Sequence, residues 1–268
     1  MSAFAFTVPE GTEPGMVMKV PALDGVMLHV SLPGNLLAGD KLFMDRDEQG
    51  QWSISRAERK APPGGAAAAP AGAARWRPVE QLEAELASPE SVRVRVMTTK
   101  GPIDVCIVPS WAPKGAERFL RLVDEGFFQD IAIYRCIPGF LVQFGVVQAG
   151  DSRSGRYQPI EDDPLVQVPF EEGSVTFAAA GPGTRKHTLC LFLGDCRSQL
   201  GSNQPETPIG RVCKECLPTL HSLHVGYGDI PQCGGKGPDP GQLEARGNEY
   251  IRSEFPACDF ITAASRVP

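Results

Sequence analysis

The sequence lacks several features that would place it in other classes of protein. No run of about 18 apolar residues occurs, so we expect no membrane-spanning helix. Positive charge is not in excess, because 26 Lys and Arg stand against 32 Asp and Glu and give a formal net charge of −6. A negative chain is poorly suited to general binding of nucleic acids or of anionic membrane surfaces. We therefore predict neither as a partner.

The first residues also lack the charged and long apolar regions of a secretory signal, and the arginines of a transit peptide. Eight cysteines are present, but they are spread along the chain and not packed into a short frame. Without a secretory signal, free thiols in a reducing compartment are the expectation. This favours a cytoplasmic location, with the nucleus as the alternative.

A second cysteine pair to match Cys213 and Cys216 is missing. These two residues have the spacing of metal ligands, but a structural zinc site needs four ligands. They also lack the βαβ context of a redox motif. We predict ordinary thiols here, with structural zinc or a redox pair as alternatives, and we predict no cofactor.

The first 56 residues contain an internal repeat. A segment that begins with Pro and ends with Gly occurs at residues 9–15 and again at 33–39, each time before a short strand-like run. Between the copies, Asp24 and Gly25 form a strong hairpin signal. Residues 1–56 are therefore predicted to be a small all-β module of four or five strands. It serves either to dock a protein partner or as a spacer.

Residues 57–78 are rich in Ala, Pro and Gly, and almost nothing in them can be buried to offset the entropy lost on ordering. We predict a flexible linker. From residue 79 to 268, strand-like and helical patterns alternate. Two helices are indicated, one opened by Pro113 and one at residues 216–225. Together with several strands they predict an α+β domain, built as a closed barrel with helices at its ends.

One stretch organises this domain, the segment YRCIPGFLVQFG at residues 134–145 and the isoleucine before it. Arg135 lies in the middle of an apolar run, where a charge is costly unless it is paired or faces a groove. In a regular strand Ile133 and Arg135 point to the same side. The Pro-Gly break that follows re-aims the chain, so that Arg135, Phe140 and Gln143 can meet on one surface.

Two interpretations of Arg135 remain open from these residues alone. The first is a peptide-binding groove equipped with a guanidinium, an aromatic ring and an amide. The second is a core strand whose arginine pairs with a carboxylate. The acidic run at residues 161–163 is read as a solvated turn, or else as the source of that carboxylate. A glycine-rich segment at 173–183 lacks the lysine and hydroxyl residue of a phosphate-binding loop, so nucleotide binding is rejected.

The order of motifs resembles the cyclophilins, which are peptidyl-prolyl cis-trans isomerases. The resemblance covers about residues 90–265 and rests on WAP at 111–113, ERF at 117–119, GFF at 126–128, the segment at 134–145, the loop AAAGP at 178–182 and PIGRV at 208–212. The later motifs GYGD at 226–229 and GNEYI at 247–251 are typical of a divergent subgroup with a longer tail. The resemblance implies a closed eight-stranded antiparallel barrel capped by two helices, with a substrate groove on its outside.

The resemblance also implies roles for individual residues. Arg135 matches the catalytic arginine, and Gln143 the glutamine that orients it. Substrate-binding positions are matched by Phe140, Leu141, Ala178, Ala179, Thr188 and Cys190. The expected function is isomerisation of X-Pro bonds in proline-containing segments of proteins, in protein folding or conformational switching, as a chaperone-like activity.

Several groove positions depart from the family pattern. Ala179 replaces an asparagine, Thr188 a glutamine and Cys190 a phenylalanine of the proline pocket, while the usual tryptophan falls near Gly201. A missing aromatic wall weakens contact with proline by about 1–3 kcal/mol. We therefore expect reduced activity and poor binding of cyclosporin-type macrocycles. The alternative is a weakly active binding or scaffold subunit of a larger assembly.

Overall fold

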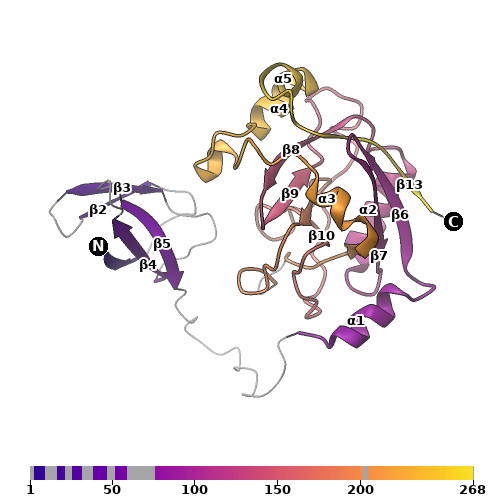
Figure 1. Ribbon diagram of the computed structural model, residues 1–268, viewed down its shortest axis with the longest axis horizontal. Helices are drawn as coiled ribbons and strands as arrows, with labels where there is room; N and C mark the ends of the chain where they lie inside the picture. Colours follow the sequence, from indigo (N-terminus) through magenta and orange to yellow (C-terminus); the bar gives the residue numbers. More distant parts are fainter. Residues whose placement is uncertain are drawn as a thin grey trace. The chain divides into compact units, whose positions relative to one another are not determined.

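The structure is a computed structural model, and it describes residues 3–9, 17–21, 26–31, 39–46, 52–58, 76–201 and 205–267. The chain divides into two compact units, Met1–Ala73 and Ala74–Pro268 (Figure 1). Most of the predicted linker at 57–78 lies outside the described residues. The same holds for most of the two repeated segments at 9–15 and 33–39.

The first unit is a small β module, as predicted. A three-stranded antiparallel sheet has the order β1 (Ala3–Thr7), β4 (Lys41–Arg46) and β5 (Trp52–Glu58). A hairpin joins β2 (Val17–Pro21) to β3 (Met27–Ser31), with Pro21 opposite Met27. The turn between them, which includes the predicted Asp24 and Gly25, lies outside the described residues. Alternate apolar side chains of these strands fill the core of the β module, among them Val20, Val30, Leu42 and Met44.

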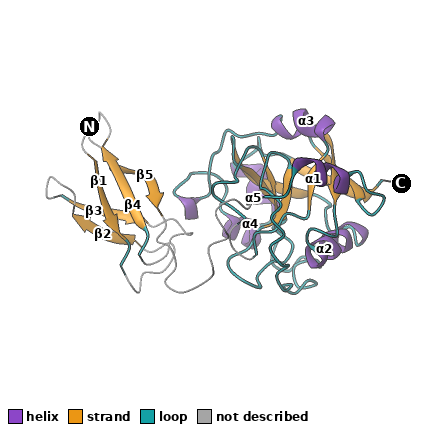
Figure 2. Ribbon diagram, turned by 90° about the horizontal axis from the view of Figure 1, so that it is seen from below, coloured by secondary structure: helices purple, strands orange, loops and turns teal. Residues whose placement is uncertain are grey.

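The second unit is a closed antiparallel barrel of eight strands, which confirms the predicted fold (Figure 2). In chain order the strands are β6 (Val92–Thr98), β7 (Gly101–Ile107), β8 (Ile131–Ile137), β9 (Leu141–Phe144), β10 (Ser174–Phe177), β11 (Leu189–Phe192), β12 (Gly210–Val212) and β13 (Phe260–Arg266). Around the barrel they follow the order β10-β11-β9-β8-β13-β6-β7-β12, and β12 returns to β10.

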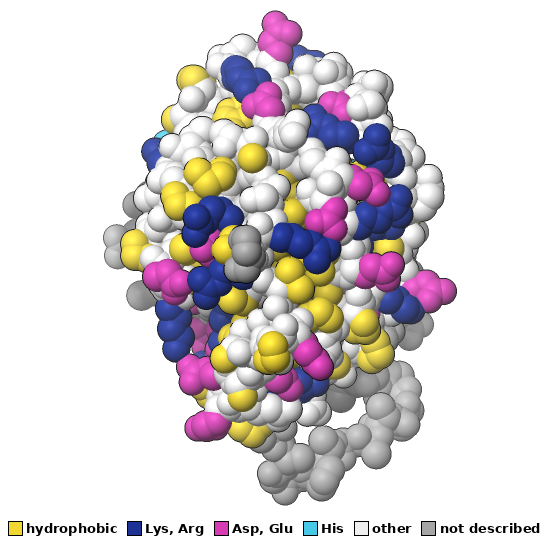
Figure 3. Space-filling view, turned by 90° about the vertical axis from the view of Figure 1, so that its right-hand side faces the viewer, with side chains coloured by type: hydrophobic (Ala, Val, Ile, Leu, Met, Phe, Trp, Pro, Cys, Tyr) yellow, Lys and Arg dark blue, Asp and Glu magenta, His cyan; other side chains and the backbone are white. Residues whose placement is uncertain are grey.

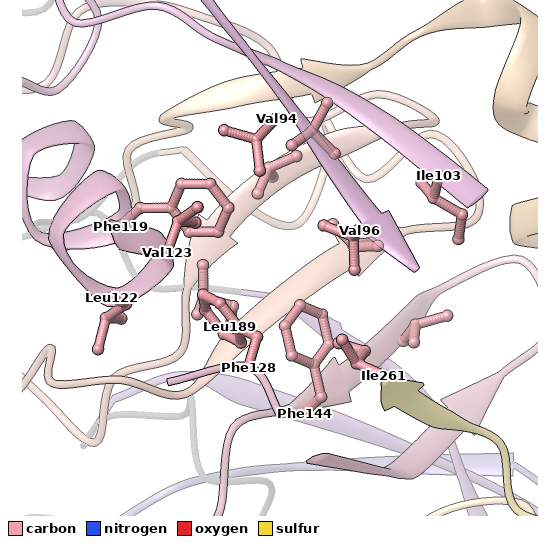
Figure 4. Packing of buried hydrophobic residues seen from close by; sticks show 14 of the residues in the cluster. Val94, Val96, Ile103, Phe119, Leu122, Val123, Phe128, Phe144, Leu189 and Ile261 are labelled. Atoms are coloured by element: carbon pink, nitrogen blue, oxygen red, sulfur yellow. The ribbon is translucent and has the colours of Figure 1, made fainter. Parts of the chain in front are cut away.

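Two helices pack apolar side chains into the barrel core. Helix α2 (Pro113–Asp124) begins with proline in its first turn and contributes Phe119 and Val123, which lie beside Val94 and Leu189 (Figure 4). Helix α3 (Leu217–His221) follows a 3₁₀ turn, η1 (Lys214–Cys216), and contributes Leu220. A further helix, α1 (Val79–Leu86), buries Leu82 against Trp111.

The acidic run at residues 161–163 is not simply a solvated turn. Asp163 is fully buried and forms an ion pair with the equally buried Arg185, with 2.9 Å between Oδ2 and Nη1. Its carboxylate also accepts the backbone N–H groups of Lys114 and Gly115 at the start of α2, both at 2.9 Å. Asp163 therefore stabilises the helix N-terminus, where a negative charge is favoured. Its partner is Arg185 and not Arg135.

The tail of the chain contributes structure that the sequence patterns did not predict. Helices α4 (Pro240–Arg246) and α5 (Asn248–Glu254) lie beside β8 (Figure 1). Leu243, Tyr250 and Ile251 of these helices form an apolar cluster with Ala132 and Tyr134 of β8. Strand β13 then enters between β6 and β8 and closes the barrel.

A β-bulge in β8 places Ile133 and Arg135 on opposite faces of the strand. Ile133 pairs with Phe144 and Arg135 pairs with Gln143, so Tyr134 is one residue too many for the ladder. Ile133 therefore lies in the barrel core, whereas Arg135 lies on the outside. The prediction that Ile133 and Arg135 share a face was wrong, because it assumed a regular strand.

Candidate active site on the outer face of the barrel

The predicted site residues lie in neighbouring strands on the outside of the barrel. Arg135 of β8 is paired with Gln143 of β9, and Gln143 is paired in turn with Cys190 of β11. Ile137, Leu141 and Phe192 form the next such row. The fold thus brings a guanidinium, an amide and an apolar surface together across three adjacent strands.

Arg135 is held by hydrogen bonds on several sides. Its Nη1 donates to Oε1 of Gln143 at 3.0 Å. Its Nε and Nη2 donate to the two carboxylate oxygens of Asp229, at 2.6 and 3.1 Å. Among the described residues, the second N–H of Nη1 has no acceptor. One donor of a fixed guanidinium therefore remains available to a bound molecule.

Asp229 also sets the charge state of this arginine. Burial lowers the pKa of Arg135, but the hydrogen bond and charge of Asp229 raise it by more, so that it lies above its ordinary value. The guanidinium is therefore a permanent cation, partly neutralised by its neighbour. Only 13% of the Arg135 side chain is exposed, so access to it is limited.

We refer to residues 226–239, which present Asp229, as the tail loop. The Asp229 carbonyl accepts the N–H of Gly237 at 2.7 Å, and a Cβ at Gly235 would lie 1.9 Å from the same oxygen. Glycine is thus required for this fold of the loop. At the far end, Asp239 caps α4 and donates its N–H to the hydroxyl of Tyr250. The tail loop is anchored on α4 and α5, which pack on β8.

The apolar part of the site is a cluster next to Arg135. Its buried members are Leu141, Phe170, Cys190, Phe192 and Cys196, with the partly buried Phe140, Ala178 and Leu200 packed on them. The Phe140 ring lies edge-on to Phe192, 6.1 Å between centroids, and the Arg135 guanidinium carbon lies 6.0 Å from the Phe140 centroid. Phe140 is thus a partly buried aromatic side chain beside the charge.

The structure also defines the surroundings of the groove positions that depart from the family pattern. Cys190 is buried, and burial raises the pKa of its thiol to about 12, so it is a small neutral group in the apolar cluster. Thr188 is partly exposed, and its carbonyl accepts the N–H of Ala178 at 2.9 Å. Ala179 is exposed at the start of the glycine-rich loop.

An aromatic ring is present near Gly201, but it comes from elsewhere in the chain. Gly201 has a φ of +83°, and a Cβ there would lie 2.6 Å from Cη2 of Trp76 and 3.3 Å from Cδ2 of Phe170. No side chain fits at position 201 unless Trp76 moves. The indole ring of Trp76 therefore lies beside Gly201, the position near which the resemblance places the groove tryptophan.

The cysteines do not combine as their spacing suggested. The Sγ atom of Cys213 lies 3.3 Å from that of Cys106, whereas Cys216 accepts the N–H of Asp104 through its own Sγ at 3.3 Å. In the described part of the chain, no three His, Cys, Asp and Glu side chains converge as metal ligands would. Nor is any helix of that part long and apolar enough to cross a membrane.

The surface around β6, β13 and α2 presents interspersed charges of both signs (Figure 3). Arg266 of β13 forms an ion pair with Asp124 at 2.6 Å, and Arg121 pairs with Glu125 at 2.7 Å. Such exposed pairs add little to the stability of a fold, because water and salt screen their charges. This face shows no concentration of one charge.

An eight-stranded antiparallel barrel with a cation and an apolar cluster on its outer face defines a class of protein, and comparison with known proteins identifies it. The family of cyclophilin type peptidyl-prolyl cis-trans isomerases matches residues 93–230, which is about half of the chain. The chain belongs to this family. The match ends within the tail loop, so α4, α5 and β13 lie beyond it.

Individual relatives are similar over parts of their length. The chain is 38% identical to a peptidyl-prolyl isomerase CWC27 of Mycosarcoma maydis over 152 residues, which are 54% of this chain and 30% of that protein. It is 30% identical to the protein of that name from Yarrowia lipolytica over 89 residues, 33% of this chain and 25% of that one. The chain thus spans about a quarter to a third of the length of these two relatives.

A solved structure of a cyclophilin type peptidyl-prolyl cis-trans isomerase of Cryptosporidium parvum also matches part of the chain. It is 18% identical, covers 66% of this chain and 98% of its own, and superimposes with a TM-score of 0.46.

Proposed function

We propose that the chain is a peptidyl-prolyl cis-trans isomerase of reduced activity, which acts on X-Pro bonds in exposed segments of other proteins. The observation that supports this most directly is the placement of Arg135, which a β-bulge turns out of the barrel core toward Gln143 and Phe140. An arginine that only stabilised the fold would not need a partly exposed aromatic ring and an apolar cluster beside it.

The chemistry follows from the nature of the peptide bond. Rotation about an X-Pro bond costs about 18–20 kcal/mol because it breaks the resonance of the amide. In the twisted transition state the proline nitrogen becomes pyramidal and basic, and it can accept a hydrogen bond. The free N–H of Arg135 Nη1 is the donor that we assign to it. Such a bond is stronger in the transition state than in either ground state, and that difference is what accelerates the reaction.

The remaining residues hold the substrate and the arginine. Phe140 and Leu141 provide the apolar surface for the proline ring, next to Ala178 and Cys190. Gln143 fixes Nη1 by accepting one of its hydrogens. Ala179 and Thr188 lie along the adjoining loop, where their backbone groups can contact the peptide. A nucleophile, metal or cofactor has no role in this reaction scheme.

Asp229 is the structural reason that we give for reduced activity. Its carboxylate engages Nε and Nη2 of Arg135 and lowers the positive potential at the guanidinium. A weaker potential stabilises the developing lone pair less. The tail loop also restricts access to an arginine that is only 13% exposed.

The alternative function is a binding or scaffold subunit in which the same groove holds a proline-containing segment without efficient turnover. The paired and covered state of Arg135 favours this reading. In either case we propose that residues 1–56 dock a protein partner. The two functions share a ligand and differ in whether Arg135 accelerates rotation.

A protease-coupled assay on a proline-containing peptide tests the enzymatic proposal. Wild type is expected to accelerate isomerisation above the uncatalysed rate, and Arg135→Ala to lower the catalysed rate by roughly tenfold or more, since it removes the transition-state donor. Arg121→Ala is the matched control, because that arginine is an exposed member of an i,i+4 pair. Equal rates for wild type and Arg135→Ala, at the uncatalysed level, would exclude the enzyme and leave the scaffold.

A further inference from the structure

Two cysteines on the outside of the barrel have no part in the proposed function. Cys106 lies on β7 and Cys213 directly follows β12, and their Sγ atoms are 3.3 Å apart. Val105 pairs with Val212, and the N–H of Cys213 donates to the carbonyl of Asp104 at 2.8 Å. The two cysteines are therefore diagonal neighbours on one face of a regular ladder. Since a disulfide bond is about 2.05 Å long, the sulfur atoms need to approach by little more than about 1 Å.

The surroundings give the two thiols different roles, with Cys106 as the nucleophile and Cys213 as the thiol that keeps its proton. The hydrogen bond shared with Cys213 lowers the pKa of Cys106 to about 6, assisted by the charge of Arg93 and against the effect of burial. Arg93 is the cross-strand partner of Cys106 on β6. The same interaction raises the pKa of Cys213. Cys106 is also the more accessible of the two, since it is partly exposed and Cys213 is buried.

Other cysteines of the chain lack this combination. Burial raises the pKa of Cys136 and of Cys190 to about 12, and both are buried. Cys258 is partly exposed, as Cys106 is, but burial raises the pKa of its thiol to about 12 as well. Cys216 is buried and already accepts a backbone hydrogen bond. Among the described cysteines, Cys106 and Cys213 are the pair whose sulfur atoms lie within hydrogen-bond distance.

We propose that Cys106 and Cys213 form a site of reversible oxidation, with a small hydroperoxide as oxidant and a low-molecular-weight thiol as reductant. In the first step the Cys106 thiolate attacks one peroxide oxygen, the O–O bond breaks, and a proton from solvent completes the leaving water, so that Cys106 becomes a sulfenic acid. In the second step the sulfur of Cys213 attacks the sulfur of Cys106, its proton goes to the departing hydroxyl, and a second water leaves.

The sum is two thiols and one hydrogen peroxide going to one disulfide and two waters, with the two electrons passing from the sulfur atoms to the peroxide. Loss of the Cys106 negative charge in the first step also removes a cause of the raised pKa of Cys213, which favours the second step. Two molecules of a small thiol reverse the reaction and leave as their own disulfide. The cross-link joins β7 to the start of η1.

Peptide mapping of the full chain tests the site. Reduced protein is treated with hydrogen peroxide, free thiols are blocked, and the digest is analysed by mass spectrometry without reduction. We expect one linked pair of peptides that contain Cys106 and Cys213, lost after dithiothreitol. Cys213→Ser is expected to leave a sulfenic acid on Cys106 that dimedone traps, whereas Cys216→Ser leaves the cross-link unchanged.

A second measurement holds even if a serine variant fails to fold. In wild type, Cys106 is expected to react with iodoacetamide at pH 7 roughly tenfold faster than Cys258, or more, because the thiolate is the reacting form. A cross-link between Cys213 and Cys216, or a Cys106 that reacts no faster than Cys258, would overturn the proposal. Neither result depends on isomerase activity, so the two proposals stand or fall separately.

Discussion

Asp229 lies outside the central motif, yet it is expected to influence the rate of the proposed reaction. Its bidentate contact with Arg135 spans 94 positions of the sequence and joins the tail loop to β8. The contact fixes the guanidinium but also withdraws two of its donors. These effects oppose each other, and we judge the loss of donors and potential to be the larger, because Gln143 already orients Nη1.

Replacing Asp229 by Asn is therefore expected to increase kcat/KM. An amide retains the shape of the side chain and removes its charge, which restores positive potential at Arg135. The increase should be about three- to tenfold, equivalent to about 1 kcal/mol of transition-state stabilisation. The protease-coupled assay measures it, with Asp239→Asn in the same loop as the control. A fall in rate would show that Asp229 acts instead to position the arginine.

His187 gives a pH dependence to stability at the residue scale. Burial lowers its pKa from 6.5 to about 4, against the hydrogen bond between Nδ1 and the carbonyl of Gly145. The unfolded chain therefore binds more protons than the folded chain between these values. The associated stability is complete above pH 6.5 and is lost as the pH falls toward 4.

We expect His187 to account for about 2 kcal/mol of that loss, after allowance for its partial exposure to solvent. Chemical denaturation of wild type and His187→Gln at pH 7 and pH 4.5 isolates the effect, because the carboxyl groups titrate in both proteins. The difference between the two should shrink at low pH. A difference that does not change with pH would contradict the lowered pKa.

Arg135 shows most clearly which parts of the site the sequence predicts and which parts only the structure reveals. The motif identified Arg135, Phe140 and Gln143, since short-range spacing and the family resemblance are both visible in one segment. The relative facing of Ile133 and Arg135 was predicted wrongly, because a bulge at Tyr134 has no signature in the residue pattern. Asp229 was quoted only as part of a tail motif, since a contact between residues 94 positions apart leaves no local trace.

Among the elements, helix α2 depends on a buried ion pair at its N-terminus. Asp163 accepts two backbone N–H groups of α2 and one bond from Arg185, and neither side chain has any exposed surface. The charges compensate each other only while both are present. Loss of one leaves an uncompensated charge in a site with little water.

Arg185→Leu is therefore expected to lower the free energy of unfolding by about 3–5 kcal/mol. The matched control is Lys114→Ala, which removes a largely exposed pair with Glu161 and should change it by about 1 kcal/mol or less. Urea denaturation followed by circular dichroism measures both. Similar small losses in the two variants would contradict a structural role for Asp163 and Arg185.

Helices and strands whose apolar residues recur at a regular period were predicted well, and those without such a period were not. Helix α2 has an apolar stripe and a proline start, so a helix opened by Pro113 was expected. Strand β13 reads Phe-Ile-Thr-Ala-Ala-Ser-Arg and is mostly exposed along its length. It has no strong alternation, and pairing with β6 and β8 is what makes it a strand.

At the scale of the whole molecule, the segment that covers Arg135 also completes the barrel. The tail loop leads into α4 and α5, which pack on β8, and then into β13, which closes the barrel between β8 and β6. Removing the tail to uncover the arginine would therefore open the barrel.

Arg135 is proposed to catalyse rotation about an X-Pro bond in a groove that also binds the peptide. Two-dimensional NMR exchange on a labelled proline peptide reads both properties in one sample: shifts of the peptide signals report binding, and cross-peaks between the cis and trans forms report the rate. For the full chain we predict exchange cross-peaks that are lost in Arg135→Ala while peptide shifts persist. Peptide shifts without exchange in the wild type would contradict the account and establish a binding protein instead.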